Sequence, residues 1–414
     1  MMKLLASILF LGISVADAQT IEKKPADAIV QSIDSLIEKE ISEYRIPGAV
    51  VQIKIGERIV ISKAYGYATR YDSLGGLLQV TEKMTTSHLF DIASLTKVVG
   101  TTTALMKLVN EGLLKVDDTI GDYLPAYKAS DKKEITIRHL LTHTAGLYEW
   151  YPMYYVSQKN RQTTYQLISS LPLKYSVGKQ RKYSDLGFTV LGQLIESVTH
   201  QSLEKYLLDS IFTPLGMNNT FYLPLQQGYK GPIAPTSFGN PYEYRMTHDS
   251  SLGFRVKEIL PESWNGWRHY LLRGEVNDGN SWYASGGVSG AAGLFSTVED
   301  LQKLVDLLLG KGMLKGRRFF KEEVLREFLS KDQFQNGLGW MMDSSSVFMR
   351  GAPIGSFGHT GFTGTSIVAL PKEKISVIIL INRQQRGLLS TGEYYNVSPL
   401  RGKIFQKVLA LRGK

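Results

Sequence analysis

The strongest constraint on the fold is that strand-forming sequence lies near both ends of the chain, whereas the middle favours helices. Residues 48–68, GAVVQIKIGERIVISKAYGYA, alternate around a Gly-Glu-Arg turn and predict a β-hairpin. Residues 365–382, TSIVALPKEKISVIILIN, predict a second hairpin that turns at residues 371–374. The simplest fold with this pattern is one α/β domain built from both ends of the chain.

Apolar residues at helical spacing predict the remaining elements. An amphipathic helix is expected at residues 25–44, and a closing helix at residues 398–412. Further helices are expected between the two hairpins, at residues 94–112, 163–171, 186–212 and 299–309.

These elements predict an antiparallel sheet flanked by the N- and C-terminal helices, with a mostly helical domain inserted into the α/β domain. The α/β domain would comprise residues 19–95 and 285–414, and the inserted domain residues 96–284. A chain of 414 residues is long for one domain, which fits two closely packed domains. The cleft between them is the expected binding site.

The first residues, MMKLLASILFLGISVADAQT, have the pattern of a secretory signal peptide. Lys3 supplies the positive end, a short apolar run follows, and residues 16–18 form a small-x-small cleavage site. We therefore expect a signal peptide at residues 1–18 and a mature protein that is periplasmic or extracellular. The apolar run is too short to span a bilayer, and no later segment predicts a transmembrane anchor. A buried N-terminal helix is the alternative interpretation.

The composition limits which catalytic groups and which classes of partner are possible. The chain has no cysteine, which excludes a thiol nucleophile and thiolate metal sites. The formal net charge is +10, but the basic residues are scattered and form no stripe interleaved with aromatic residues. We therefore expect no nucleic-acid partner, and only a general attraction to anionic cell-wall polymer or substrate.

Four Ser-x-x-Lys pairs occur in the chain, so this spacing alone does not identify a catalytic serine. Ser130 lies in a charged loop, and Ser176 is followed by Gly178, which disfavours a helix. Ser202 fits a helix cap whose lysine faces solvent. Ser94 follows the stretch FDIA and opens the apolar run VVGTTTALMKLV, which predicts a hydroxyl at the N-terminus of a buried helix.

Ser94 and Lys97 have the chemistry of a nucleophile and its base. A serine hydroxyl needs a base to take its proton, and three residues along a helix put Lys97 on the same face. An apolar surround favours the neutral amine, which can accept or relay a proton. Free backbone N–H groups at the helix N-terminus can stabilise an oxyanion. On this stretch alone, a serine that only caps the helix explains the residues equally well.

Two further stretches favour the catalytic interpretation. KYSDLGF at 182–188 places Tyr183 and Asp185 just before a helix. FGHTGFTG at 357–364 precedes the alternating run TSIVAL, which predicts that its HTG triplet lies on an edge strand beside the cleft.

Taken together, these stretches resemble the signature of the serine β-lactamase and penicillin-binding-protein family, in its class C-like branch. SLTK at 94–97 is similar to Ser-x-x-Lys, YSD at 183–185 to Tyr-x-Asn, and HTG at 359–361 to Lys-Thr-Gly. The stretches LLTHTAGL (140–147) and GGVSGAAGLFSTVEDL (286–301) are similar to further parts of that branch. The order and spread match over nearly the whole mature chain, and the resemblance implies a β-lactamase/transpeptidase-like fold.

The resemblance also implies roles for single residues. Ser94 would be the acylated nucleophile, and Lys97 and Tyr183 would share the proton transfer. The backbone N–H groups of Ser94 and Phe362 would form the oxyanion hole.

The substrate-binding positions depart from the family pattern at two places. The resemblance implies that His359, Thr360 and Gly361 hold the polar end of the substrate, but imidazole is a weaker, pH-dependent cation than the lysine expected there. Asp185 replaces the amide of the second motif and adds negative charge near Lys97. Both changes disfavour a penicillinase, whose substrate carboxylate needs a firm positive partner, and both are compatible with esterase or peptidase-like branches.

One loop is similar to a segment of family members that act on esters or cell-wall fragments, namely GEVNDGNSWYASGG at 274–287. Asp278 and Asn280 are its candidate cleft residues, and a Gly/Asn turn without catalytic function is the alternative. His143, in THTAGL, is expected to be structural. The histidines show no metal-ligand spacing and no Gly-rich phosphate loop occurs, so neither a metal nor an organic cofactor is expected.

The sequence thus predicts an exported serine hydrolase that forms an acyl-enzyme on Ser94. The expected substrate is an amide or ester, preferably in a peptidoglycan fragment, as in a muropeptide amidase or a D,D-peptidase-like enzyme. A carboxylesterase and a weak class C-like β-lactamase are the alternatives among enzymes. A penicillin-binding or sensor domain that is acylated without turnover is the alternative of another class.

Overall fold

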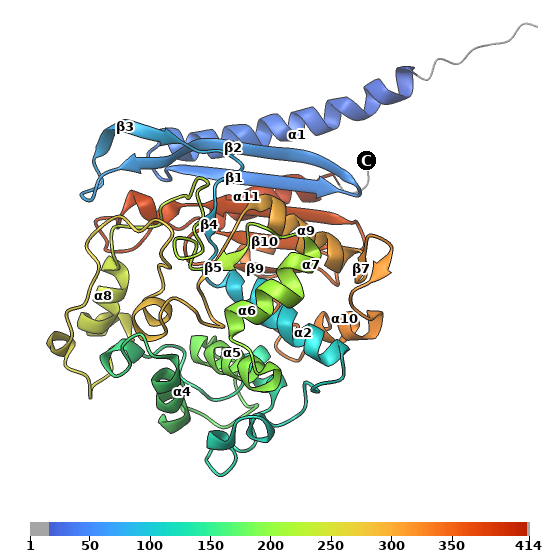
Figure 1. Cartoon of the computed structure of the whole chain (residues 1–414). Helices are drawn as coiled ribbons and strands as arrows, with labels where there is room; N and C mark the ends of the chain where they lie inside the picture. Colours follow the sequence, from blue (N-terminus) through green and yellow to red (C-terminus); the bar gives the residue numbers. More distant parts are fainter. Residues whose placement is uncertain (1–15, 412–414) are drawn as a thin grey trace, which may run out of the picture.

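A six-stranded antiparallel sheet organises the structure, a computed structural model that describes residues 16–411 (Figure 1). Its strands follow the order β3-β2-β1-β11-β10-β9. They are β1 (Gly48–Ile55), β2 (Arg58–Tyr71), β3 (Leu77–Lys83), β9 (Phe357–Thr360), β10 (Ser366–Leu370) and β11 (Ile375–Ile381). Both predicted hairpins are confirmed, and β1 pairs with β11, so the two chain ends form one sheet.

Helices cover both faces of this sheet. On one face, α1 (Ala16–Ser42) and α11 (Ser398–Leu409) pack together, and Ile37 and Ile404 share a buried cluster with alternate residues of β1 and β11. On the other face, α9 (Val298–Leu309) packs against β11. Strand β11 is buried along its whole length because both faces are covered, so its sequence is continuously apolar. The expected architecture, an antiparallel sheet flanked by the N- and C-terminal helices, is confirmed.

The chain between residues 96 and 284 contributes no strand to the six-stranded sheet. It holds most of the remaining helices: η1 (Lys97–Thr102), α2 (Thr103–Asn110), α3 (Ile137–Leu141), α4 (Arg161–Ser170), α5 (Asp185–Thr199), α6 (Leu203–Leu207), η5 (Leu208–Phe212), α7 (Thr213–Leu215), α8 (Pro241–His248) and η8 (Asn280–Ala284). Helix α10 (Glu322–Phe328) follows α9. The predicted domain boundaries at residues 95 and 285 stay predictions.

Two smaller sheets lie apart from the six-stranded sheet in the strand pairing. One contains β4 (Phe90–Asp91), β6 (Leu294–Ser296) and β5 (Phe221–Tyr222), and the other pairs β7 (Met313–Leu314) with β8 (Arg317–Arg318). The predicted helix over 186–212 is wrong in one respect, because His200 adopts a left-handed conformation that ends α5 before α6 begins.

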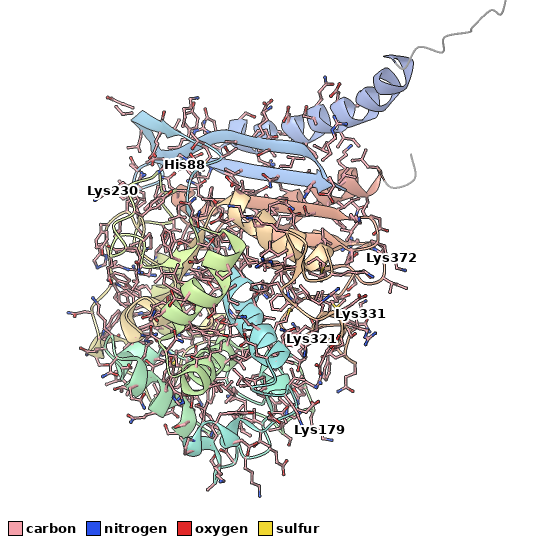
Figure 2. The ribbon with its side chains drawn as sticks, turned by 45° about the vertical axis from the view of Figure 1, so that its right-hand side comes forward. His88, Lys179, Lys230, Lys321, Lys331 and Lys372 are labelled. Atoms are coloured by element: carbon pink, nitrogen blue, oxygen red, sulfur yellow. The ribbon has the colours of Figure 1, made fainter. Side chains whose placement is uncertain are left out.

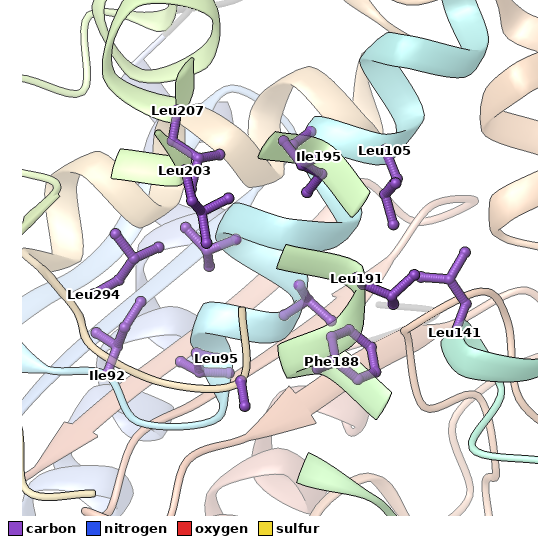
Figure 3. Packing of buried hydrophobic residues seen from close by; sticks show 14 of the residues in the cluster. Ile92, Leu95, Leu105, Leu141, Phe188, Leu191, Ile195, Leu203, Leu207 and Leu294 are labelled. Atoms are coloured by element: carbon purple, nitrogen blue, oxygen red, sulfur yellow. The ribbon is translucent and has the colours of Figure 1, made fainter. Parts of the chain in front are cut away.

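The helix that follows Ser94 crosses the centre of the larger core. Leu95, Leu105 and Leu294 pack with Phe188 and Leu191 of α5 in one cluster (Figure 3). Lys97–Thr102 has the wider π-helical turn and all six of its residues are buried. The serine is therefore carried by an element whose position is fixed by core packing on every side.

Most of the predicted signal peptide lies outside the described residues. Residues 1–15 belong to that part of the chain, and α1 begins at Ala16. Cleavage after residue 18 thus stays a prediction. Among residues 16–411, no helix combines the length and the apolar character that a membrane crossing requires.

The basic side chains are dispersed over the molecule. The labelled lysines lie at separate places, from Lys179 at the lower end to Lys230 and Lys372 on opposite sides (Figure 2). This distribution agrees with the scattered charge in the sequence.

Candidate active site

Ser94 lies at a strained turn between β4 and the buried helix. Ala93 has a φ of +46°, in the left-handed region that side chains other than glycine rarely adopt. The buried Asp91 carboxylate stabilises this turn, because its Oδ1 accepts the Ala93 N–H at 2.8 Å. Ser94 is half-buried and lines a cavity of about 670 Å³.

Lys97 is fully buried beneath Ser94 and has three partners. Its Nζ donates to Ser94 Oγ at 3.0 Å and to the Ala291 carbonyl at 2.9 Å. It also forms an ion pair with Asp185 Oδ1 at 2.7 Å. Burial lowers the pKa of Lys97, but Asp185 and Tyr183 outweigh burial and raise that pKa above its usual value. The expectation of a neutral amine is therefore wrong, since it considered the apolar surround without this carboxylate.

Of the four Ser-x-x-Lys pairs, Ser94/Lys97 has a lysine that is both buried and bonded to its serine. Lys133, Lys179 and Lys205 are exposed, and Lys205 pairs with Asp209.

Tyr183 faces the same pair from the segment before α5. The Lys97 Nζ lies 5.1 Å from the centre of the Tyr183 ring, and both Tyr183 and Ser94 line the cavity. Burial raises the pKa of Tyr183, as does the Asp185 carboxylate, while Lys97 and Ser94 lower it by charge and hydrogen bonding. The net direction is upward, so Tyr183 is a neutral phenol at pH 7.

Asp185 is the first residue of α5, where its carboxylate is favoured by the helix dipole. Ser184 caps this helix by accepting the Gly187 N–H at 3.1 Å, which fixes the direction of the first turn. Because Asp185 Oδ1 is held by Lys97, the carboxylate is part of the Ser94–Lys97 network and also lines the cavity.

His359 lies on β9, at the edge of the main sheet, as predicted. Its side chain is buried, and its Nδ1 lies 2.9 Å from the Thr360 carbonyl, so Nδ1 carries the proton. Nε2 has no hydrogen-bond partner among residues 16–411 and is left as an acceptor. Burial, followed by the charge of Lys97, lowers the pKa of His359 to about 3. His359 is therefore neutral at pH 7 and is no cation for a carboxylate.

The turn after β9 is bonded to the segment before Ser94. Thr363 Oγ1 donates to the Asp91 carbonyl at 2.8 Å, and Thr365 Oγ1 to the Ile92 carbonyl at 3.1 Å. A Cβ on Gly361 would lie 2.5 Å from the Ile92 carbonyl oxygen, so this approach requires glycine. The backbone N–H groups of Ser94 and Phe362 have no acceptor within the described part of the chain. Two free donors thus border the cavity beside the nucleophile.

The two loop candidates differ in position. Asp278 lines the cavity, and burial and the nearby Asp185 raise its pKa. Asn280 does not line the cavity: its buried amide accepts the Met153 N–H and donates to the Tyr151 carbonyl, both at 2.9 Å. The expectation that Asn280 lines the cleft is corrected, because both ends of its amide are used to join two loops.

Charged side chains that the sequence analysis missed also line the cavity. Burial, with Asp278 nearby, raises the pKa of Glu243 to about 8, and burial beside Arg383 lowers the pKa of Arg401 to about 9. No local pattern marks these residues, since only the tertiary fold brings α8 and α11 to one cavity. Glu149, Arg181 and Arg383 also line the cavity. The lining further includes aromatic and apolar side chains, namely Trp150, Tyr242, Met246, Phe254, Met341, Phe362 and Tyr394.

No group of three or more His, Asp or Glu side chains within residues 16–411 is placed to hold a metal ion. The arrangement instead supplies a serine hydroxyl, a buried ammonium, a phenol and two free N–H donors. Such a set can support acyl transfer to serine.

Comparison with known proteins gives a family match over most of the chain. The model of the Beta-lactamase family matches residues 33–397. An N-acetylmuramyl-L-alanine amidase of Bacillus subtilis strain 168 is 31% identical over 387 residues, which cover 89% of this chain and 84% of that protein. A putative D-alanyl-D-alanine carboxypeptidase of Salmonella typhimurium strain LT2 is 34% identical over 345 residues, or 78% of this chain and 76% of that protein.

Solved structures share the fold at lower identity. A class C β-lactamase matches with a TM-score of 0.68 and 18% identity, over 94% of this chain and 97% of the other. A D-alanine carboxypeptidase from Burkholderia cenocepacia matches with a TM-score of 0.65 and 18% identity, over 93% of this chain and 99% of the other.

Proposed function

Because this chain belongs to the Beta-lactamase family, we propose that it is a serine hydrolase that is acylated on Ser94 and cleaves an amide bond in a peptidoglycan fragment. The observation that carries the proposal is the hydrogen bond of 3.0 Å from the buried Lys97 Nζ to Ser94 Oγ beside Tyr183. Export of the mature protein is part of the proposal, since peptidoglycan lies outside the cytoplasm.

The proposed acylation step uses the groups around Ser94. Ser94 Oγ attacks the substrate carbonyl carbon, and the two free N–H groups of Ser94 and Phe362 stabilise the oxyanion. Tyr183 takes the serine proton while its own proton passes to the leaving nitrogen, so no ionised base is required. The Lys97 ammonium, held by Asp185, stabilises negative charge that develops on Ser94 Oγ. Water then attacks the carbonyl carbon of the acyl-enzyme. Tyr183 takes a proton from this water while its own proton passes to Ser94 Oγ, which frees the serine.

The substrate proposal rests on the relatives and on the cavity. The names of two relatives refer to amides of N-acetylmuramyl-L-alanine and D-alanyl-D-alanine. A cavity of about 670 Å³ lined by Trp150, Tyr242 and Tyr394 suits a sugar- or peptide-bearing ligand. Neither neutral His359 nor Asp185 supplies, at its motif position, the positive charge that the family lysine would offer a penicillin carboxylate; the arginines of the cavity, Arg181, Arg383 and Arg401, lie outside these motifs.

We predict that kcat/KM for a muropeptide amide or a simple ester exceeds kcat/KM for benzylpenicillin or a chromogenic cephalosporin. The double variant Asp185→Asn with His359→Lys restores the family residues and is expected to shift the preference toward β-lactams. Steady-state kinetics on all four substrates provide the test. If benzylpenicillin is the best substrate of the unmodified enzyme, the peptidoglycan proposal is wrong and a penicillinase takes its place.

The same four substrates distinguish repeated turnover from a single acylation of the enzyme. We expect many product molecules per enzyme on at least one amide or ester. One equivalent of product, with a stable adduct at Ser94, would instead identify a penicillin-binding or sensor domain. Preference for the ester over every amide would favour a carboxylesterase.

Tyr183→Phe removes only the phenolic oxygen and keeps the ring that packs beside Lys97. If Tyr183 transfers the proton, kcat should fall by about 10²-fold or more, because positioned acid–base groups contribute effects of this size. Tyr123→Phe is the matched control, since the Tyr123 hydroxyl donates to Asp118 Oδ2 at 2.6 Å and does not line the cavity. A change under about threefold for Tyr183→Phe in a folded protein would count against the role.

A further inference from the structure

We infer that His143 is a positioning residue for Tyr183, a role that rests on the proposed function of Tyr183 in proton transfer. His143 does not line the cavity, so it has no direct contact with a substrate there. Its effect on the reaction would pass through the tyrosine.

His143 contacts three consecutive residues around the phenol. Its carbonyl accepts the Lys182 N–H at 3.0 Å, and its Nδ1 accepts the Ser184 N–H at 3.0 Å. Between these two bonds, the His143 ring packs on the Tyr183 ring with 4.4 Å between the ring centres and 33° between the planes. The backbone on both sides of Tyr183 and its aromatic ring are therefore held by one side chain and its own carbonyl.

The position of the His143 ring is itself fixed. Its φ of +60° lies in the left-handed region, which histidine adopts more readily than most residues. The ring is buried, and Phe188 of α5 packs on it at 5.2 Å. The Tyr175 hydroxyl, at 3.3 Å, is a second donor to the His143 carbonyl. These contacts restrain the His143 ring on several sides, so that it can hold the Tyr183 ring in one orientation.

The contacts also assign the tautomer of His143. Because Nδ1 accepts the Ser184 N–H, the ring proton is on Nε2. An imidazolium would carry a proton on Nδ1 and could not accept this bond. Burial, and then the charges of Arg181 and Lys97, hold the pKa of His143 well below its usual value. The neutral acceptor form therefore persists at the pH where the enzyme would work.

The test is a double-mutant cycle in the full chain. His143→Asn tolerates the left-handed backbone but removes the ring, and its kcat should fall about tenfold, with a smaller change in KM. Added to Tyr183→Phe, the same substitution should change kcat by less than about twofold, because its effect passes through the missing phenol. His139→Asn is the matched control: the His139 Nδ1 also accepts a backbone N–H, from Thr136 at 3.1 Å, without contacting Tyr183.

Equal losses of kcat with and without the Tyr183 hydroxyl would overturn the inference, as would a folded His143→Asn variant with unchanged kcat. A purely structural role would lower the melting temperature of both histidine variants without this non-additivity. If His143→Asn does not fold, the inference is tested by measuring the tautomer of His143 with ¹⁵N NMR of histidine-labelled wild-type protein. The inference requires the Nε2–H tautomer of His143, and an Nδ1–H or doubly protonated ring would contradict it.

Failure of this inference can be told apart from failure of the proposed function. If Tyr183→Phe itself keeps full activity, the proposed proton transfer is wrong. If Tyr183→Phe loses activity and His143→Asn does not, only the positioning role is wrong.

Discussion

Replacing Ser94 with alanine is expected to lower kcat/KM by at least about 10⁴-fold on every substrate that the enzyme turns over. The expected loss is this large because Ser94 Oγ is the atom that forms the acyl bond in the proposed reaction. Lys97 Nζ, 3.0 Å from Ser94 Oγ, would have nothing to activate. Alanine removes one oxygen from a half-buried site, so the fold should persist.

Active-site labelling measures the same assignment directly. A fluorophosphonate probe, read by peptide mass spectrometry, should modify Ser94 and leave Ser130, Ser176 and Ser202 unmodified. Alanine variants of these three serines are the matched controls and should keep kcat within about twofold, because their paired lysines are exposed. Modification of one of the three with Ser94 untouched would overturn the assignment.

Replacing Lys97 with methionine should lower kcat by about 10³-fold, within the range of positioned acid–base groups. Methionine fills most of the same buried space but lacks the terminal ammonium, so it removes the charge beside Ser94. The variant also leaves the Asp185 carboxylate without its partner at 2.7 Å, which should lower the melting temperature.

A second substitution separates these two effects of Lys97→Met. Adding Asp185→Asn removes the unpaired charge, so the melting temperature should recover while kcat stays low. Lys107→Met, on helix α2 directly after η1, is the control, since Lys107 pairs with Glu111 at 2.7 Å and does not line the cavity. A folded double variant with kcat within about tenfold of wild type would show that Lys97 takes no part in the reaction.

The sequence by itself determined the elements that depend on local periodicity. The period-two pattern predicted both hairpins, and β1 and β11 pair as two strands from opposite ends of one chain. The apolar run after Ser94 predicted a buried helix, and Lys97 is indeed fully buried on it. The HTG triplet beside a strand pattern predicted an edge strand, which β9 is. These features follow from neighbours within one or two turns or strands, so the local sequence contains them.

Only the tertiary structure decided the charge states and partners at the site. From its surroundings in sequence, Lys97 was expected to be neutral, but α5 brings Asp185 to 2.7 Å from its ammonium and keeps it charged. The HTG triplet predicts only a weak, pH-dependent cation at His359, and burial in the fold lowers its pKa further, to about 3, with Nε2 left as an acceptor. Asn280 was expected in the cleft, but it bonds the loop at Tyr151 and Met153.

The local sequence predicts the elements but not the charge states because the two depend on interactions of different range. Whether a stretch forms a helix or a strand depends on side-chain spacing over a few residues. A pKa or a free acceptor depends on which groups lie within a few ångströms, whatever their separation along the chain. Ser94, Tyr183 and His359 come from distant segments, and the packing of α5, β9 and the buried helix around one core brings them to the same cavity.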